Sequence, residues 1–183
     1  MKILNKSIRT IIAAAILSTT QITAFTQPVN INGNAHDNLD SRLLKQEKEA
    51  IRQLIANETE SYYQQDFEAW KSNFVDAPYF REYGYWEGYP EKVKHFNGFD
   101  TLKNFKQKQF NENGTIWKGS YEKRYNENFR IYPDIAWYTF EEKSYNSETD
   151  AFLGRSFETR ILEKHDGKWK IAYLGFHYLP NKK

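Results

Sequence analysis

Glu58 interrupts the apolar face of a predicted helix, and this position suits its carboxyl group to proton transfer. It follows Leu54 and Ile55 by four and three residues, and Tyr62 follows it by four. Helical spacing places these side chains on one face. A half-buried carboxyl group has a raised pKa and can act as an acid or a base near neutral pH. Glu58 and Tyr62 are therefore candidate catalytic residues. A place at the edge of the stripe, or an ion pair with an arginine, is the structural alternative for Glu58.

Charged and aromatic side chains alternate along two predicted strands near the C-terminus. Glu158 and Arg160 are two residues apart, as are successive same-face positions in any strand. On the preceding strand, Tyr138 and Glu142 likewise share a face. A carboxylate-bearing ligand, or Glu58, is a suitable partner for Arg160. The structural alternative is an ion pair of Arg160 with Glu142 or Glu158.

Residues 79–99 contain an unusual density of rings. Aromatic side chains provide a ligand with a large contact area and, in Tyr and Trp, a polar edge. We therefore interpret Tyr83 and Trp86, together with Trp70 and His95, as candidate ligand-binding residues. A dimer interface or a ring-built core is the alternative for the rings, and an isolated surface position is the alternative for His95. The eight rings are Tyr79, Phe80, Tyr83, Tyr85, Trp86, Tyr89, Phe96 and Phe99.

Composition restricts the possible chemistry. The 183 residues suit one domain, and 17% of them are aromatic, so rings are expected to provide much of the buried area. The absence of cysteine excludes disulfides, thiolate catalysis, zinc ribbons and iron–sulfur clusters. The net charge of +2, without a block of like charges, argues against an electrostatic nucleic-acid binder. No histidine pair has metal-ligand spacing and no phosphate-binding glycine loop occurs, so we predict no metal and no cofactor.

The N-terminal segment is typical of an export signal. Residues 1–24 combine Lys2, Lys6 and Arg9 with a short apolar run over residues 11–17, as a secretory signal peptide does. We expect cleavage near Ala24 and a periplasmic or secreted bacterial protein without a membrane span. Residues 25–40 are polar and aperiodic and predict a flexible tether. The folded domain is then expected over residues 41–183.

The hydrophobic period changes from helical to strand-like along this domain. Helices are predicted over residues 44–62, in a short segment that Asp66 caps, and after a cap at Asp100. The dipeptide Asp166-Gly167 predicts a tight hairpin between the last two strands. The fold class is therefore α+β, with helices on one face of an antiparallel sheet. The predicted strands are 79–85, 93–96, 120–132, 135–145, 153–164 and 169–179.

Four stretches resemble the nuclear transport factor 2-like (NTF2-like) superfamily, whose members include the SnoaL-like cyclases. They are residues 49–55 leading to 65–70, residues 98–100, 133–138 and 159–171. The resemblance covers about residues 44–180 and implies three helices on a strongly curved antiparallel sheet, a cone-shaped barrel that encloses a pocket. The sequence also resembles the association domain of calcium/calmodulin-dependent kinase, in which the equivalent of Arg160 points into the pocket. That domain has another arginine where this sequence has Glu142, so its ligand preference is not expected here.

The resemblance implies three functions. One is an exported protein that binds a small apolar or aromatic molecule in an aromatic-lined pocket, without turnover. The second is a cofactor-free isomerase, dehydratase or cyclase that uses Glu58 as its base, with Tyr62 or Arg160 stabilising negative charge. The third is a dimeric structural or partner-binding module. Members of one fold perform all three functions, so the fold alone does not select among them.

Overall fold

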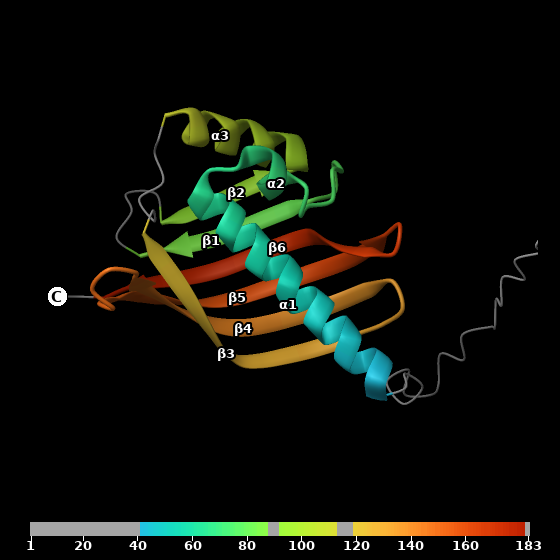
Figure 1. Ribbon diagram of the computed structural model, residues 1–183. Helices are drawn as coiled ribbons and strands as arrows, with labels where there is room; N and C mark the ends of the chain where they lie inside the picture. The colour runs from blue at the N-terminus through green and yellow to red at the C-terminus, as the bar shows by residue number, and fades with distance from the viewer. Residues whose placement is uncertain (1–40, 88–91, 113–118, 182–183) are drawn as a thin grey trace, which may run out of the picture. The chain divides into compact units, whose positions relative to one another are not determined.

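A helix that crosses one face of the sheet opens the described part of the chain. The computed structural model describes residues 41–87, 92–112 and 119–181, so the predicted signal peptide and tether lie outside the described residues. Helix α1 (Ser41–Gln64) buries Ile51, Leu54 and Ile55, as its apolar stripe predicts. Figure 1 shows α1 lying diagonally across the strands. No helix in these ranges is long and apolar enough to cross a membrane.

Two shorter helices lie beside the β1 and β2 end of the sheet (Figure 1). Helix α2 (Phe67–Lys71) has Asp66 as its N-cap, as predicted. Helix α3 (Phe99–Asn111) starts two residues earlier than predicted, and the expected cap at Asp100 is wrong. Gly98 occupies the N-cap position with φ of 84°, which glycine adopts without strain. Asp100 instead lies in the first turn and pairs with Lys103 at 2.6 Å.

Six strands form one curved, unclosed sheet in the described residues (Figure 1). Their order is β2-β1-β6-β5-β4-β3, and the predicted long antiparallel strands are present. One pairing differs from the expected antiparallel sheet, because β1 and β6 run parallel. The predicted hairpin at Asp166-Gly167 is confirmed, with both residues at positive φ. The strands are β1 (Arg81–Trp86), β2 (Val93–Asn97), β3 (Ser120–Ile131), β4 (Ile135–Asn146), β5 (Phe152–His165) and β6 (Lys168–Pro180).

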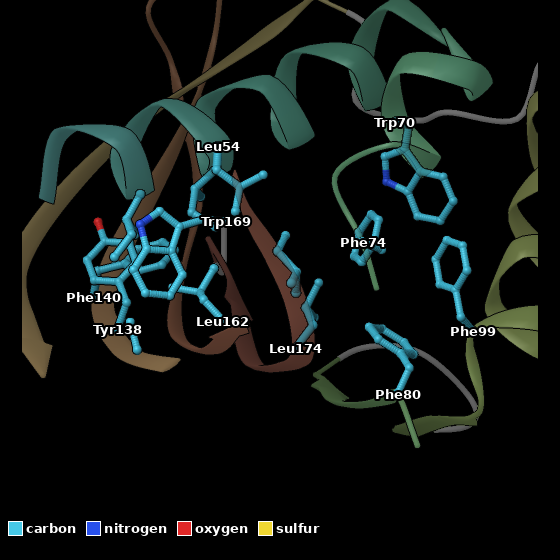
Figure 2. Packing of buried hydrophobic residues seen from close by; sticks show 14 of the residues in the cluster. Leu54, Trp70, Phe74, Phe80, Phe99, Tyr138, Phe140, Leu162, Trp169 and Leu174 are labelled. Carbon is cyan, nitrogen blue, oxygen red and sulfur yellow. The ribbon is translucent and has the colours of Figure 1, made fainter. Parts of the chain in front are cut away.

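Rings form much of the core, as the composition predicts. Trp70, Phe74, Phe80 and Phe99 pack together where α2 and α3 meet the sheet, with the Trp70 and Phe74 centroids 4.7 Å apart. Figure 2 shows this ring group beside a second group that includes Trp169 and the strand residues of β4 to β6. Such stacked and edge-on pairs contribute beyond the area that they bury. The first group packs α2 and α3 against the sheet near β1.

The cap of α2 provides a direct test of how this region is positioned. The Asp66 side chain accepts a hydrogen bond from the Ala69 amide at 3.0 Å. We expect Asp66→Ala to lower the free energy of unfolding by about 1 kcal/mol, because the amide loses its acceptor. Asp66→Asn retains a capping oxygen and should restore most of the loss. Urea unfolding measures both variants. Equal losses in the two variants would contradict a capping role.

Candidate functional site

A cavity of about 180 Å³ lies on the helix side of the sheet. Its lining comes from α1, α2, α3 and all six strands, so residues far apart in sequence meet there. The walls combine rings with carboxyl groups. Among the described residues, no group of three His, Asp or Glu side chains is arranged to hold a metal ion.

Seven of the ten predicted site residues line this cavity. They are Glu58, Tyr62, Trp70, Trp86, Glu142, Glu158 and Arg160. Three do not line it: Tyr83, His95 and Tyr138. The structure therefore brings together both candidate catalytic residues and five of the eight candidate binding residues.

Strand alternation removes Tyr83 and His95 from the cavity. Tyr83 and Trp86 are three residues apart in β1, so their side chains point to opposite faces. Trp86 lines the cavity, whereas Tyr83 lies on the outer face and stacks on His95 of β2 at 6.2 Å. The even-numbered residues of β1, Glu82 and Trp86, are the ones that face the cavity.

Tyr138 has the correct strand face but the wrong end of the strand. It is fully buried between Phe129 and Phe140, with centroids 4.2 and 4.6 Å away. Its hydroxyl donates to Glu127 at 2.5 Å, and Glu127 is also bound by Arg52 of α1. Tyr138 thus belongs to the contact between α1 and β3–β4. The cavity begins farther along β4, at Glu142.

Helix α1 places Glu58 and Tyr62 one turn apart at the cavity wall. Helix α3 faces them: the Lys106 ammonium lies 4.4 Å from the centre of the Tyr62 ring. The Tyr62 hydroxyl and the Gln109 side chain approach to 3.4 Å. Beside Glu58, the Thr59 hydroxyl accepts a hydrogen bond from Arg124 of β3 at 2.8 Å. Helix α1 is therefore linked to both α3 and the far strand of the sheet at this level.

Two ion pairs, one buried and one half-buried, form the strand wall of the cavity. Arg160 pairs with Glu158 at 2.7 Å, and both side chains are only 7% exposed. The predicted structural alternative for Arg160 is thus present, with Glu158 as its partner. Arg124 lies 2.8 Å from Glu142, and sequence reasoning missed it. The register of β3 and β4 pairs these two positions directly, which the sequence alone does not reveal.

Burial and paired charges act against each other on these groups. Burial raises the pKa of Glu158, and Arg160 offsets part of that rise. Burial likewise raises the pKa of Glu142, against the attraction of Arg124. For Arg160, burial disfavours the charge, yet Glu158 and Glu58 outweigh this effect and raise its pKa. Each ion pair therefore stabilises charged side chains that burial in the cavity wall would otherwise disfavour.

Two further acids line the cavity and were missed by sequence reasoning. Glu82 of β1 is 6% exposed, and burial raises its pKa to about 7 although Lys106 opposes the rise. Glu122 of β3 accepts a hydrogen bond from the Tyr63 hydroxyl, and burial raises its pKa as well. Glu82 and Tyr83 are adjacent in β1, so their side chains point to opposite faces of the sheet. Counting rings assigned Tyr83 to the cavity and overlooked Glu82, which is the one that lines it.

The ring-rich segment divides among three locations. Phe80 and Phe99 belong to the core, whereas Trp86 and Phe96 line the cavity. Tyr79, Tyr83 and Tyr85 are not part of the lining, and Tyr79 and Tyr83 are exposed. Tyr89 lies outside the described residues. The pocket and core interpretations therefore each describe part of the segment.

Comparison with known proteins gives a fold without a described activity. No family model matches the sequence, and no curated protein matches it. A Nostoc punctiforme protein of unknown function with a cystatin-like fold is 19% identical, with a TM-score of 0.59, over 73% of this chain and 92% of that one. A Shewanella oneidensis NTF2-like protein of unknown function is 15% identical, with a TM-score of 0.52, over 71% and 98%.

A third structure is related to the domain that the sequence resembles. It is a putative calcium/calmodulin-dependent protein kinase type II association domain from Thiobacillus denitrificans. It is 10% identical, with a TM-score of 0.52, over 69% of this chain and 92% of that one. Identities this low establish a shared architecture and no shared chemistry. With its helices on one face of a curved six-stranded sheet, this chain has a cystatin-like, or NTF2-like, fold.

Proposed function

We propose that this protein binds a small apolar or aromatic molecule in the cavity. The observation that carries the proposal is the lining itself, in which rings from α2, β1, β2 and β6 surround polar groups from α1 and β5. Binding sites are usually concave and mainly apolar, with a few placed polar groups that fix orientation. Trp70, Phe74 and Phe176 provide ring surface here, and Arg160 and Glu158 provide the polar groups.

The size of the cavity restricts the ligand. An apolar cavity of about 150 Å³ holds benzene in another protein. The 180 Å³ found here therefore suits a body of about one ring. One wall of the cavity is closely packed: the Phe176 ring lies directly against Gly84, where any side chain would overlap the ring.

Proton transfer is the second candidate function. Glu58, Tyr62 and Arg160 line the same cavity, which is the arrangement that a cofactor-free isomerase, dehydratase or cyclase would need. Arg160 is already paired with Glu158, and this favours binding over catalysis.

Export is also part of the proposal, and it rests only on the sequence of residues 1–24. The mass of the chain recovered from a periplasmic or culture fraction would show whether these residues have been removed.

A homodimer is the third part of the proposal. The outer face of the sheet carries exposed apolar side chains on adjacent strands, including Trp137 (57% exposed) and Ile135 of β4 and Phe157 of β5. Exposed apolar patches of this kind often form interfaces. A second copy that covers this face would leave the cavity on the helix side free.

Filling the cavity should prevent binding. Leu174 of β6 lines the cavity, so Leu174→Phe places an additional ring in the space that the ligand would occupy. We expect the affinity for one-ring aromatic molecules such as benzyl alcohol to fall at least about tenfold. Ile161→Phe is the matched control, because Ile161 of β5 pairs with Trp137 and Tyr173 outside the cavity lining. Calorimetry measures both variants.

The same samples separate the candidate functions. A ligand that is recovered unchanged after prolonged incubation, as read by NMR, supports binding, and its conversion supports catalysis. Equal binding in wild type and Leu174→Phe would place any ligand site elsewhere on the protein.

The oligomeric state provides a separate check of the outer sheet face. We expect sedimentation to show a dimer whose population grows with concentration, and Trp137→Lys to shift it to monomer, because a charge would replace a large and exposed apolar side chain of the face. A wild-type monomer at all concentrations would remove the dimer from the proposal without affecting the cavity.

Stability should decrease as the pH rises, because Glu82 is buried. Its pKa is about 7 in the folded protein against a usual value of 4.5, so the folded state retains a proton that the unfolded state releases. The free energy of unfolding should therefore fall between about pH 4.5 and 7, by roughly 3 kcal/mol from Glu82. Urea unfolding across this range measures the decrease.

Glu82→Gln isolates this contribution. The variant should lose part of the pH-dependent decrease, because its amide does not ionise. Glu148→Gln, in the exposed turn between β4 and β5, is the matched control and should behave as the wild type. Parallel pH profiles of the wild type and Glu82→Gln would show that Glu82 is not responsible.

A further inference from the structure

The cavity lining contains more carboxylates than cations. The lining residues include five glutamates, against Arg160, Lys94 and Lys106. Arg124 adds a fourth cation from just outside the lining by pairing with Glu142. With every group ionised, one carboxylate is in excess. A cation therefore complements the cavity better than an anion does.

The acids of the strand wall differ in what neutralises them. Glu158 is paired with Arg160, and Glu142 with Arg124. Glu122 accepts a hydrogen bond from the Tyr63 hydroxyl. Each of these three carboxylates therefore has a partner within the protein, although Oε2 of Glu122 is buried without a hydrogen bond of its own.

Glu82 has no such partner. Its side chain is 94% removed from solvent and lines the cavity, yet it makes no hydrogen bond or ion pair with any residue in the described ranges. Lys106 and Arg160 favour its charge only from longer range, whereas Glu58 and Glu158 oppose it. A buried carboxylate without a partner is unfavourable, and a ligand that brings a cation there would supply that partner.

Apolar side chains lie beside Glu82 on the sheet. The register of β1 places it opposite Phe96 of β2 and Leu174 of β6. Trp86, four residues along β1, points to the same face and packs edge-on against Phe176 at 5.9 Å. Ring faces attract cations, most strongly when water is excluded.

The protein's own ammonium groups already use rings of this lining. Lys106 lies 4.4 Å from the centre of Tyr62, and Lys94 lies 5.8 Å from that of Trp86. The cavity therefore combines an unpartnered buried carboxylate with several rings that accept cations.

We propose that the ligand is a small organic ammonium ion, a protonated amine on an apolar or aromatic body, whose nitrogen lies against the carboxylate of Glu82. This inference rests on the proposed binding function and specifies its ligand class. The ammonium group donates one or two hydrogen bonds to the Glu82 carboxylate, and the apolar body lies among the rings near Trp86 and Phe176. Such a pair supplies the partner that the protein itself does not provide.

Three one-ring probes of similar size test the charge preference. Benzylammonium, benzyl alcohol and benzoate are titrated into the full chain by calorimetry above pH 7, where Glu82 is ionised. We expect benzylammonium to bind at least about tenfold more tightly than benzyl alcohol, and benzoate to bind more weakly than either. In Glu82→Gln the advantage of benzylammonium should fall to within about twofold. Glu148→Gln, which is exposed and remote from the cavity lining, should retain it.

A second measurement does not depend on how well the variant folds. In the wild type, the advantage of benzylammonium should increase as the pH rises through about 7, because Glu82 then becomes charged. The other charged groups around Glu82 are Lys106 of α3, Glu58 of α1, and Glu158 and Arg160 of β5. An advantage that does not change with pH, or that persists in a folded Glu82→Gln, would exclude Glu82 as the anchor.

The outcomes also separate this inference from the proposed function. Tight binding of benzyl alcohol or benzoate, with no advantage for benzylammonium, would overturn the amine class and leave the cavity as a binding site. No binding of any probe, in a chain that unfolds cooperatively, would contradict both proposals.

Discussion

The buried pair of Arg160 and Glu158 is the interaction on which the cavity depends. Both side chains are almost removed from solvent, so each charge is tolerable only while the other is present. The pair lies on β5, in the middle of the sheet, with β4 on one side and β6 on the other. Loss of either partner would leave a bare charge between the ring-rich walls. The pair therefore allows two charged groups to remain in a cavity wall that also contains many rings.

The two halves of the core make this interior possible. Trp70, Phe74 and Phe99 attach α2 and α3 beside β1, whereas Trp169 donates to Glu47 at 2.6 Å and ties α1 to β6. Between these supports, the cavity is lined by both rings and carboxyl groups. Glu82 lowers the stability of the fold relative to a hydrophobic residue of similar size, because its carboxyl group is buried. A role in ligand binding would explain why a glutamate occupies this position.

Periodicity in the sequence was sufficient for the helices, the long strands and the hairpin at Asp166-Gly167, because each depends on local spacing. Glu58 and Tyr62 were found for the same reason, since a helix of known stripe fixes their face. Sheet register is not local, so the pairing of Arg124 with Glu142 could not be predicted. Tyr83 was misplaced because counting rings in a segment ignores strand alternation, and the same alternation would have identified Glu82. The parallel pairing of β1 with β6 likewise depends on contacts across the whole chain.

A crystal structure of the protein grown with benzylamine would show whether an amine binds at Glu82. We expect density for one ring among the aromatic walls of the cavity, with the amine nitrogen within hydrogen-bond distance, about 3 Å, of a Glu82 carboxylate oxygen. Glu158 should remain paired with Arg160. A cavity filled by the protein's own side chains, or an amine bound elsewhere with Glu82 facing a lysine of the protein, would contradict this expectation.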